Sequence, residues 1–353
     1  MHSTDPASVF LSIRARTRNV TPEAIESALY ERRTLLRMLG MRRTMFVVPD
    51  ELAPVIQAAC TASIAETTRK RYVQLLTEAG LGDGVWLRDL EQAALVALEA
   101  KGEATGVQLS AAEPRLRTPI TLAEGKPYSG TQNVTTWVLF MLAADGHIVR
   151  GRPQGSWTSS QYRWSPVRRW LPDGMATLAA EEARVELVRR WLQAFGPATV
   201  ADIKWWTGWT AGHVKKALTA IGPEEVDVDG VPAIVLPGDA APTKAPKPWI
   251  AFLPALDPTP MGWQERSWFL GPHAAALFDR SGNVGPTIWA DGRIVGGWAH
   301  RADGTVGYRL LEDIGSEAAK KVEQEAAAVA EWIGPVRVTP RFRTPLEREL
   351  VAS

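Results

Sequence analysis

Hydrophobic and polar positions follow a period that changes from helical to strand-like several times along the chain. The clearest succession lies in the second half of the chain. Apolar residues at helical spacing predict helices over residues 181–195, 199–206 and 210–221. Thr199, three residues before Asp202, opens the second helix as in a capping box. Two strand-like runs then flank Asp229-Gly230, so this region has the helix-helix-helix-hairpin order of a winged helix-turn-helix module.

The same order occurs between residues 87 and 166. Helices are predicted over residues 87–101, 105–111 and 132–144, and hairpin strands over residues 147–152 and 156–164. The Pro- and Gly-rich stretch 115–130 within this region carries no predicted element. The sequence therefore predicts a second winged-helix module around a stretch that it leaves unexplained.

A third succession occupies the N-terminal 50 residues and is incomplete. Asp5-Pro6 and Thr21-Pro22 are pairs that start helices, and they predict helices that run to about Arg16 and Arg33. Hairpin strands are predicted over residues 35–39 and 44–48. Because only two helices precede this hairpin, we expect the chain to begin inside its first module.

The composition changes after Pro237, where residues 239–248 are typical of a linker. Strands are predicted over residues 249–256, 287–290, 293–301, 306–311 and 336–339, with a helix over residues 317–332. The expected fold class is α+β, with three tandem winged helix-turn-helix modules and a C-terminal β-rich α+β domain. The expected domains are residues 1–50, 51–172, 173–240 and 247–353.

The composition excludes several kinds of site. Cys60 is the only cysteine and the five histidines are scattered, which excludes a disulfide within the chain and predicts no metal or other cofactor. No Gly-rich phosphate loop with its Lys is present, which disfavours a nucleotide-dependent enzyme. No apolar run approaches the roughly 20 residues of a membrane-spanning helix, and no signal peptide opens the chain. We therefore expect a cytoplasmic protein that does not contact membranes.

Basic charge is local. Lys+Arg 40 nearly balance Asp+Glu 39, yet residues 146–172 contain no acidic residue. Arginines in this stretch predict a hairpin that lies along a phosphate backbone, and the alternative is a solvated basic hairpin without a partner. Further arginine clusters lie at residues 14–43 and 337–348. No recognisable base-reading pattern accompanies them, so we expect contacts with the DNA backbone.

Four segments resemble one known family. They read HSTDPASVFLSIRAR…LYERRTLLRMLGMRRTMFVVP, RGRPQGSWTSSQYRW, FGPATVADIKWWTGW and FLPALDPTPMGWQERSW…GPTIWADGRIVGGW. In this order they resemble the AlkZ/YcaQ-like winged-helix DNA glycosylases, over most of the chain. The resemblance implies a monofunctional enzyme that hydrolyses the N-glycosidic bond of N7-alkylated purines and unhooks interstrand crosslinks in double-stranded DNA.

The resemblance also implies where the chemistry takes place. The family motif is Gln-x-Gln or Gln-x-Asp before an Asp-Pro-like helix start, and here His2 and Thr4 occupy those positions, a departure from both forms. In an extended segment these two side chains point to one side and could orient one water. The following helix N-terminus favours a neutral, basic His2. Asp5 is a further catalytic candidate, with helix capping as the alternative.

The residues expected to contact DNA come from motif matches and from the arginine clusters. They are Arg42, Arg43, Thr44, Arg150, Arg152, Ser156, Gln161, Tyr162, Arg163, Arg168, Lys204, Trp205, Asp257, Arg266, Arg341 and Arg343. For Asp257 the alternative is a turn residue before Pro258. Two functions stay open, a glycosylase and a non-catalytic winged-helix DNA-binding protein or regulator. Either would be a nucleoid-associated monomer.

Overall fold

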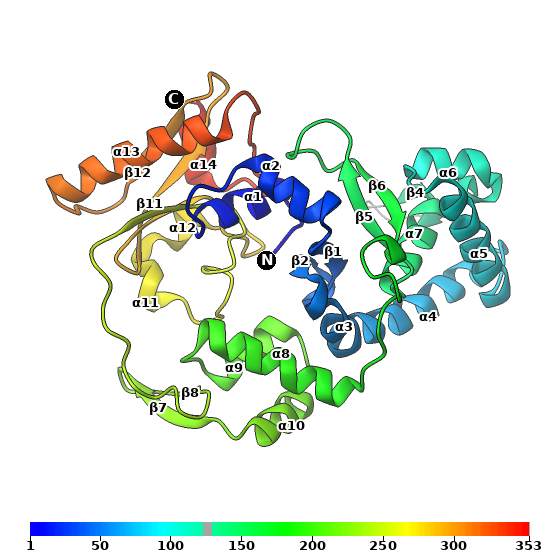
Figure 1. Ribbon diagram of the computed structural model, residues 1–353, viewed down its shortest axis with the longest axis horizontal. Helices are drawn as coiled ribbons and strands as arrows, with labels where there is room; N and C mark the ends of the chain where they lie inside the picture. The colour runs from blue at the N-terminus through cyan, green and yellow to red at the C-terminus, as the bar shows by residue number, and fades with distance from the viewer. Residues whose placement is uncertain (123–128, 353) are drawn as a thin grey trace. The chain divides into compact units, whose positions relative to one another are not determined.

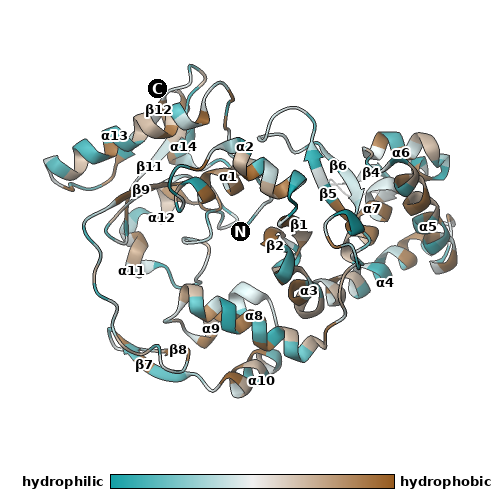
Figure 2. Cartoon of the chain, viewed as in Figure 1, coloured by the Kyte–Doolittle hydropathy of each residue, from teal (hydrophilic) through white to brown (hydrophobic). Residues whose placement is uncertain are grey.

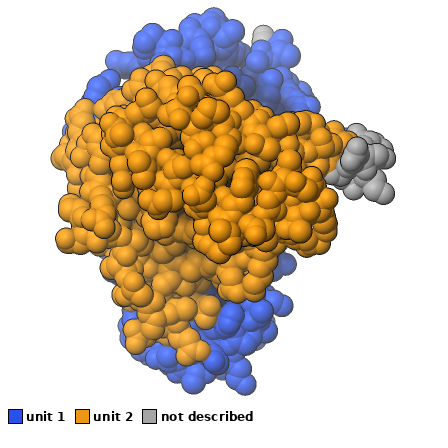
Figure 3. Space-filling model, turned by 90° about the vertical axis from the view of Figure 1, so that its right-hand side faces the viewer, with its two compact units in different colours: residues 1–26, 156–160, 188–353 blue, residues 27–155, 161–187 orange. Residues whose placement is uncertain are grey.

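The computed structural model describes residues 1–122 and 129–352, which form helices and small antiparallel sheets (Figure 1). The α+β class predicted from the sequence is therefore confirmed. The chain forms two compact units, which Figure 3 distinguishes by colour. The first unit contains residues 1–26, 156–160 and 188–353, and the second contains residues 27–155 and 161–187.

Helices build the core of the second unit. The main ones are α4 (Ala62–Glu78), α5 (Gly84–Lys101), α6 (Gly106–Ala112) and α7 (Thr135–Ala144). Asp83 and Thr105 cap α5 and α6 by accepting backbone hydrogen bonds, as is typical of these residues before a helix. Leu90, Leu98 and Trp137 are buried in one cluster formed by α5, α7 and their neighbours. The predicted helices thus meet through their apolar faces.

The stretch without a predicted element contains a short hairpin. β3 (Pro119–Leu122) pairs with β4 (Gly130–Asn133), and residues 123–128 lie outside the described part of the chain. Gln132 pairs with Ile120 in this hairpin. Helix α7 therefore begins after β4, at Thr135, and not at the predicted residue 132.

The strands of two further hairpins belong to the second unit. β1 (Leu35–Leu39) pairs with β2 (Met45–Pro49), as predicted. β5 (Ile148–Pro153) pairs with β6 (Tyr162–Pro166), so the predicted strand over residues 156–164 begins too early. Trp157 explains the difference, because its ring is buried and stacks on Phe10 in the first unit at 4.8 Å between ring centroids. Residues 156–160 serve this packing and not the strand ladder.

The first unit contains the helices and hairpin predicted most clearly. α8 (Ala180–Phe195) leads into it, followed by α9 (Val200–Thr207), α10 (Ala211–Ile221) and the hairpin β7 (Glu224–Val228) with β8 (Val231–Val235). Thr199 and Asp202 form the reciprocal capping box. Asp229 and Gly230 both have positive φ, 51° and 83°, as a two-residue turn of type I′ requires.

A four-stranded antiparallel sheet completes the first unit. Its order is β12 (Val306–Leu310), β11 (Arg293–His300), β10 (Thr287–Ala290) and β9 (Ile250–Leu253). Helix α13 (Ser316–Ile333) packs on β9 and β12, and α14 (Pro345–Ala352) packs on β11. Hydrophobic and hydrophilic residues alternate along α13 in Figure 2, and the buried ones include Val322 and Val329. Helix α1 (Pro6–Arg14) belongs to this unit as well.

The predicted last strand over residues 336–339 is wrong. This segment has no regular structure, and proline residues at positions 335 and 340 remove backbone donors on both sides of it. The backbone N–H of Val338 donates instead to Nδ1 of His300, at 3.1 Å. Helix α14, which the sequence analysis did not predict, follows, and the missing side chain of Gly297 gives Leu346 its place on β11.

His300 predicts a pH dependence of stability. Burial lowers the pKa of His300 below its ordinary value of 6.5, and protonation of Nδ1 removes the acceptor for Val338. Since the folded pKa is depressed, this contribution is present above pH 6.5 and is lost as the pH falls through the lower folded pKa. We expect the thermal midpoint of the wild type to fall over this window more than that of His300→Asn, whose Oδ1 keeps the acceptor. Equal slopes for both proteins would contradict this.

Candidate functional site

Exposure alternates from residue to residue in the segment before α1. Ser3 and Asp5 are buried, 1% and 5% exposed, whereas His2 and Thr4 are both partly exposed. Asp5 itself has extended backbone angles, φ −101° and ψ 118°. The alternation is that of an extended segment, with His2 and Thr4 on its more accessible side. In this arrangement the side chains of two residues, two positions apart, can hydrogen-bond the same water molecule.

Asp5 holds this segment in place. Its Oδ1 accepts the backbone N–H of Ala7 at 3.0 Å, which makes it the N-cap of α1, and its Oδ2 accepts the backbone N–H of Arg341 at 3.0 Å. Burial raises the pKa of Asp5, and these backbone hydrogen bonds oppose the shift. Both oxygens thus accept a backbone hydrogen bond and 5% of the residue is exposed, so Asp5 is the cap of α1, while its expected part in catalysis stays a prediction. It also brings Arg341, whose side chain is exposed, to the start of α1.

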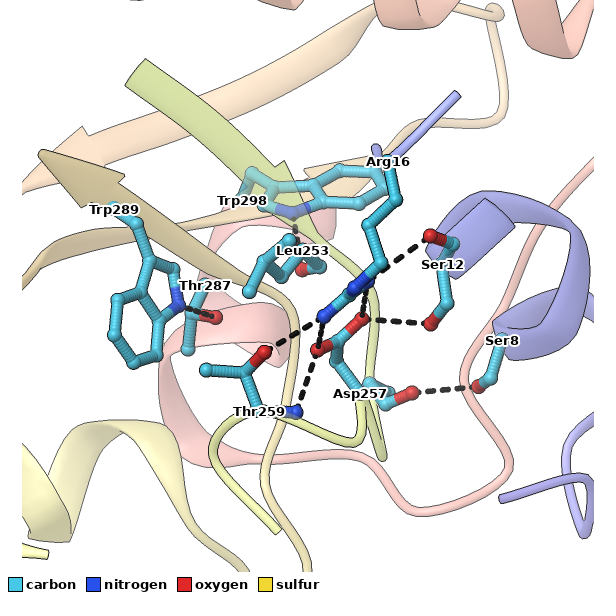
Figure 4. A network of polar contacts seen from close by, with 10 residues as sticks. Ser8, Ser12, Arg16, Leu253, Asp257, Thr259, Thr287, Trp289 and Trp298 are labelled. Carbon is cyan, nitrogen blue, oxygen red and sulfur yellow. Dashed lines mark hydrogen bonds and ion pairs between the residues drawn. The ribbon is translucent and has the colours of Figure 1, made fainter. Parts of the chain in front are cut away.

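One face of α1 is fixed to the loop that follows β9 (Figure 4). Ser8 and Ser12 lie on this face, one turn apart, and Arg16 follows four residues later, just beyond the end of the helix. Ser8 Oγ donates to the carbonyl oxygen of Ala255 at 2.6 Å, and Ser12 Oγ donates to Oδ2 of Asp257 at 2.7 Å. The helix that carries the candidate catalytic segment is thereby attached to the sheet domain.

Asp257 is the centre of this network. Arg16 binds it through two parallel hydrogen bonds, Nη2 to Oδ1 at 2.7 Å and Nη1 to Oδ2 at 2.8 Å, and the backbone N–H of Thr259 donates to Oδ1 at 2.9 Å. Asp257 is 0% exposed. The expected direct contact between Asp257 and DNA is therefore wrong, because its carboxylate is enclosed and saturated within the protein.

Arg343 also has a structural partner. Its Nε donates to Oε2 of Glu347 at 2.7 Å, one turn further along α14, and Glu347 is 2% exposed. If Arg343 left this contact, the Glu347 carboxylate would remain buried without a partner, so Arg343 holds the start of α14. Its expected contact with DNA stays a prediction.

Two predicted DNA contacts from distant parts of the sequence meet in the first unit. The guanidinium of Arg266 lies over the ring of Trp205 in α9, at 5.0 Å from the ring centroid, and over the ring of Phe278, at 4.9 Å. Lys204 beside Trp205 is exposed. Asp202 fixes the two segments to each other, because its Oδ1 accepts the backbone N–H groups of Gln264 and Glu265. The motif matches thus converge on one surface.

The second unit contains a stack of arginine and tyrosine side chains, which we call the arginine–tyrosine stack. It consists, in order, of Arg150, Tyr162, Arg37, Tyr30 and Arg152. Successive guanidinium carbons lie 5.5, 4.9, 5.9 and 5.1 Å from the ring centroids. Cation–π contacts of this kind order Arg150 and Arg152, the two arginines of β5. Arg152 is further paired with Glu31, at 3.1 Å.

The remaining predicted contacts lie on hairpins and are accessible. Arg42 and Arg43 in the loop between β1 and β2 are exposed and have positive φ, 52° and 58°, a conformation that costs energy for residues other than glycine. Thr44 follows them and is partly exposed. The hairpin β5–β6 and the turn after it contribute Gln161, Arg163 and Arg168, which are exposed, and the loop between these strands contributes Ser156, which is partly exposed.

Sequence reasoning missed two sets of residues. Ser8, Ser12 and Arg16 show a four-residue spacing that marks one helix face, but nothing in the sequence names Asp257 as their partner. Tyr30 and Arg37 lie in a segment that resembles the family, but the sequence does not reveal their partners, because their proximity to β5 and β6 depends on contacts between segments more than a hundred residues apart. Among the described residues, no helix is long and apolar enough to cross a membrane, and no cluster of His, Cys, Asp or Glu is arranged to hold a metal ion.

Comparison with known proteins connects this geometry to one family. A curated interstrand DNA cross-link repair glycosylase of Streptomyces sahachiroi is 31% identical over 171 residues, which are 46% of this chain and 46% of the relative. The match thus spans about half the length of that relative. The solved structure of the Streptomyces sahachiroi DNA glycosylase AlkZ has a TM-score of 0.70 at 21% identity and covers 97% of this chain and 90% of that one. The two proteins therefore share a fold.

A family model described as DNA glycosylase AlkZ-like matches residues 1–332. This range includes the segment of His2 and Thr4, the hairpins and the surface of Trp205 and Arg266. Because the match extends over nearly the whole chain, the protein belongs to the AlkZ-like DNA glycosylase family.

Proposed function

We propose that the protein is a monofunctional DNA glycosylase that hydrolyses the N-glycosidic bond of N7-alkylated purines, including those in interstrand crosslinks. The observation that carries this proposal is the family match over residues 1–332, which includes an N-terminal segment where His2 and Thr4 share one accessible side. The relative from Streptomyces sahachiroi is named for cross-link repair.

Hydrolysis of this glycosidic bond requires only modest catalysis from His2 and Thr4. An N7-alkylated purine is cationic and leaves readily, so the attacking water needs orientation more than deprotonation. The imidazole of His2 and the hydroxyl of Thr4 can each hydrogen-bond one water. His2, if neutral, accepts a proton as the new bond forms at the sugar carbon, and the purine leaves with the electrons of the glycosidic bond. Asp5 contributes by capping α1, which fixes the backbone on which both residues lie.

Double-stranded DNA is the proposed partner, bound by winged-helix modules. Three hairpins support this, β1–β2, β5–β6 and β7–β8, since each is a separate two-stranded sheet that follows helices in the chain. We propose the modules within residues 1–50, 51–172 and 173–240, with residues 247–353 as the β-rich domain. The exposed arginines of the first two hairpins then face the phosphates.

Salt dependence tests these backbone contacts. Each phosphate contact that is lost lowers the slope of log K against log salt by about 1. Arg163→Gln and Arg168→Gln remove exposed guanidinium groups, and each is expected to reduce the slope by about 1 in duplex binding measured by fluorescence anisotropy. Lys320→Gln on α13 is the control and should leave the slope unchanged. If all three variants keep the wild-type slope, these two arginines do not contact phosphates.

The proposed activity is tested by base release. Duplex DNA with a single N7-methylguanine, and a second duplex with a nitrogen-mustard crosslink, are incubated with the protein, and the released base and the separated strands are quantified. Release that follows enzyme concentration supports the glycosylase. Tight duplex binding without release of a base from either duplex would instead favour a non-catalytic DNA-binding protein. This is the second candidate function, because His2 and Thr4 depart from the glutamine motif of the family.

A further inference from the structure

A cavity of about 290 Å³ lies in the second unit, between β1, β5 and α7. Its volume is near the lower end of the range for small-molecule sites. Most of its lining is apolar, and the larger side chains that contribute include Met38, Leu39, Met45, Leu139, Phe140 and Trp164. An apolar chamber of this size suits a flat ring system or a short aliphatic body.

The polar groups of the cavity have one sign of charge. Arg37 and Arg150 both line it, and no aspartate or glutamate is among its described lining residues. Arg37 is 2% exposed, and its Nη1 donates to the hydroxyl of Tyr30. Its Nε and Nη2 are buried without a hydrogen-bond partner among the described residues, and it forms no ion pair with any of them. The cavity therefore borders a desolvated cation that lacks a counter-charge.

A buried guanidinium without an acceptor is costly. Removing an ion from water is strongly unfavourable unless an opposite charge or hydrogen bonds replace the water. The rings of Tyr162 and Tyr30, in the arginine–tyrosine stack, offset part of this cost through cation–π contacts. They do not satisfy Nε and Nη2, whose N–H groups lie in the plane of the guanidinium and need acceptors in that plane.

A second polar group at the cavity also has an unused site. Nε2 of Gln57 donates to the carbonyl oxygen of Ala144 at 2.8 Å, which fixes the orientation of the amide. Its Oε1 is buried without a partner among the described residues. Arg37 and Gln57, which both line the cavity, thus each have buried polar atoms without a hydrogen-bond partner among the described residues. Such atoms are unusual in a well-packed core.

We propose that this cavity is a binding site for a small organic acid, with a flat apolar body and one carboxylate. The carboxylate accepts two hydrogen bonds from Nε and Nη2 of Arg37, the bidentate arrangement that a guanidinium favours, and Arg150 adds a second positive charge. The apolar body lies among Leu139, Phe140 and Trp164. A cationic N7-alkylpurine is repelled by the same two arginines, so this site is separate from lesion binding and does not depend on the proposed glycosylase activity.

The test uses 2-naphthoate as the probe and the uncharged 2-naphthamide as its matched control, titrated into the full-length protein by calorimetry. We expect naphthoate to bind at least tenfold more tightly than naphthamide at physiological salt. Arg37→Met should abolish this preference, and circular dichroism shows whether that variant is folded. Ala143→Phe narrows the cavity from α7 and leaves Arg37 intact, so it should weaken both ligands at least tenfold.

Three results would overturn the proposal. One is equal affinity for naphthoate and naphthamide, or no binding of either at millimolar concentration. Another is an unchanged preference for naphthoate in folded Arg37→Met or, should that variant not fold, in Arg37→Lys, which keeps the charge but loses the bidentate geometry. The third is unchanged naphthoate affinity in Ala143→Phe, which would assign the binding to the basic surface and not to the cavity.

Discussion

We expect His2→Ala to release N7-methylguanine from duplex DNA about a hundredfold more slowly than the wild type, with duplex affinity unchanged. General-base groups contribute roughly a hundredfold to ten-thousandfold in rate. The lower end applies here because a cationic purine is a good leaving group and the water needs mainly to be positioned. Single-turnover release, measured with enzyme in excess, isolates this step from product dissociation.

Two further substitutions show what His2 supplies. His2→Gln introduces the residue that the family motif has at this position, and it should retain activity if orientation of water is the role. Thr4→Val keeps the shape of Thr4 but loses its hydroxyl, and it should slow release less than His2→Ala does. If wild type and His2→Ala release the base at the same slow rate, the enzymatic interpretation is wrong and the DNA-binding protein remains.

Asp257→Asn is expected to lower the free energy of unfolding of the first unit by about 3 kcal/mol, which corresponds to a thermal midpoint about 6–12 °C lower. Asp257 is fully buried and accepts four hydrogen bonds, from Arg16, Ser12 and Thr259. An amide supplies a donor where these groups require an acceptor. The value is at the low end for a broken buried pair because the Arg16 side chain is 38% exposed and regains water.

A double-mutant cycle separates the ion pair from general damage. Asp257→Asn, Arg16→Met and the double variant should show that the second substitution costs less when the first is present, with a coupling of at least 1 kcal/mol. Asp239→Asn in the exposed linker segment is the matched control and should unfold like the wild type. Strictly additive losses in the cycle would show that Arg16 and Asp257 do not stabilise each other.

Local chemistry made much of the secondary structure predictable. Thr199 and Asp202 satisfy the first backbone donors of α9 by themselves, and Asp229-Gly230 adopts the positive φ angles of its turn without help from the rest of the chain. Asp5 was identified as a cap for the same reason. Errors arose where another element competes. Residues 156–160 read as a strand but bury Trp157, and residues 336–339 read as a strand but donate to a histidine side chain.

Part of the candidate site was likewise predictable from the sequence and part was not. The position of His2 and Thr4 before a capped helix, and the arginines on the hairpins, could be read from residue order and charge. The burial of Asp257 could not be predicted, because the sequence shows a polar residue before a proline and does not show that Ser12 and Arg16 enclose it. The neighbours of Arg37 could not be predicted either. They come from distant segments, and helical or strand periodicity shows only which nearby residues share a face.

The sequence by itself determined the capped helix starts and the tight turns, because capping and turn geometry act within a few residues. It also determined the family and the location of basic charge. Only the tertiary structure decided which charged groups are enclosed, which aromatic rings order the arginines and where a cavity remains. Those properties depend on the desolvation that distant segments impose on each other, and no local pattern in the sequence encodes it.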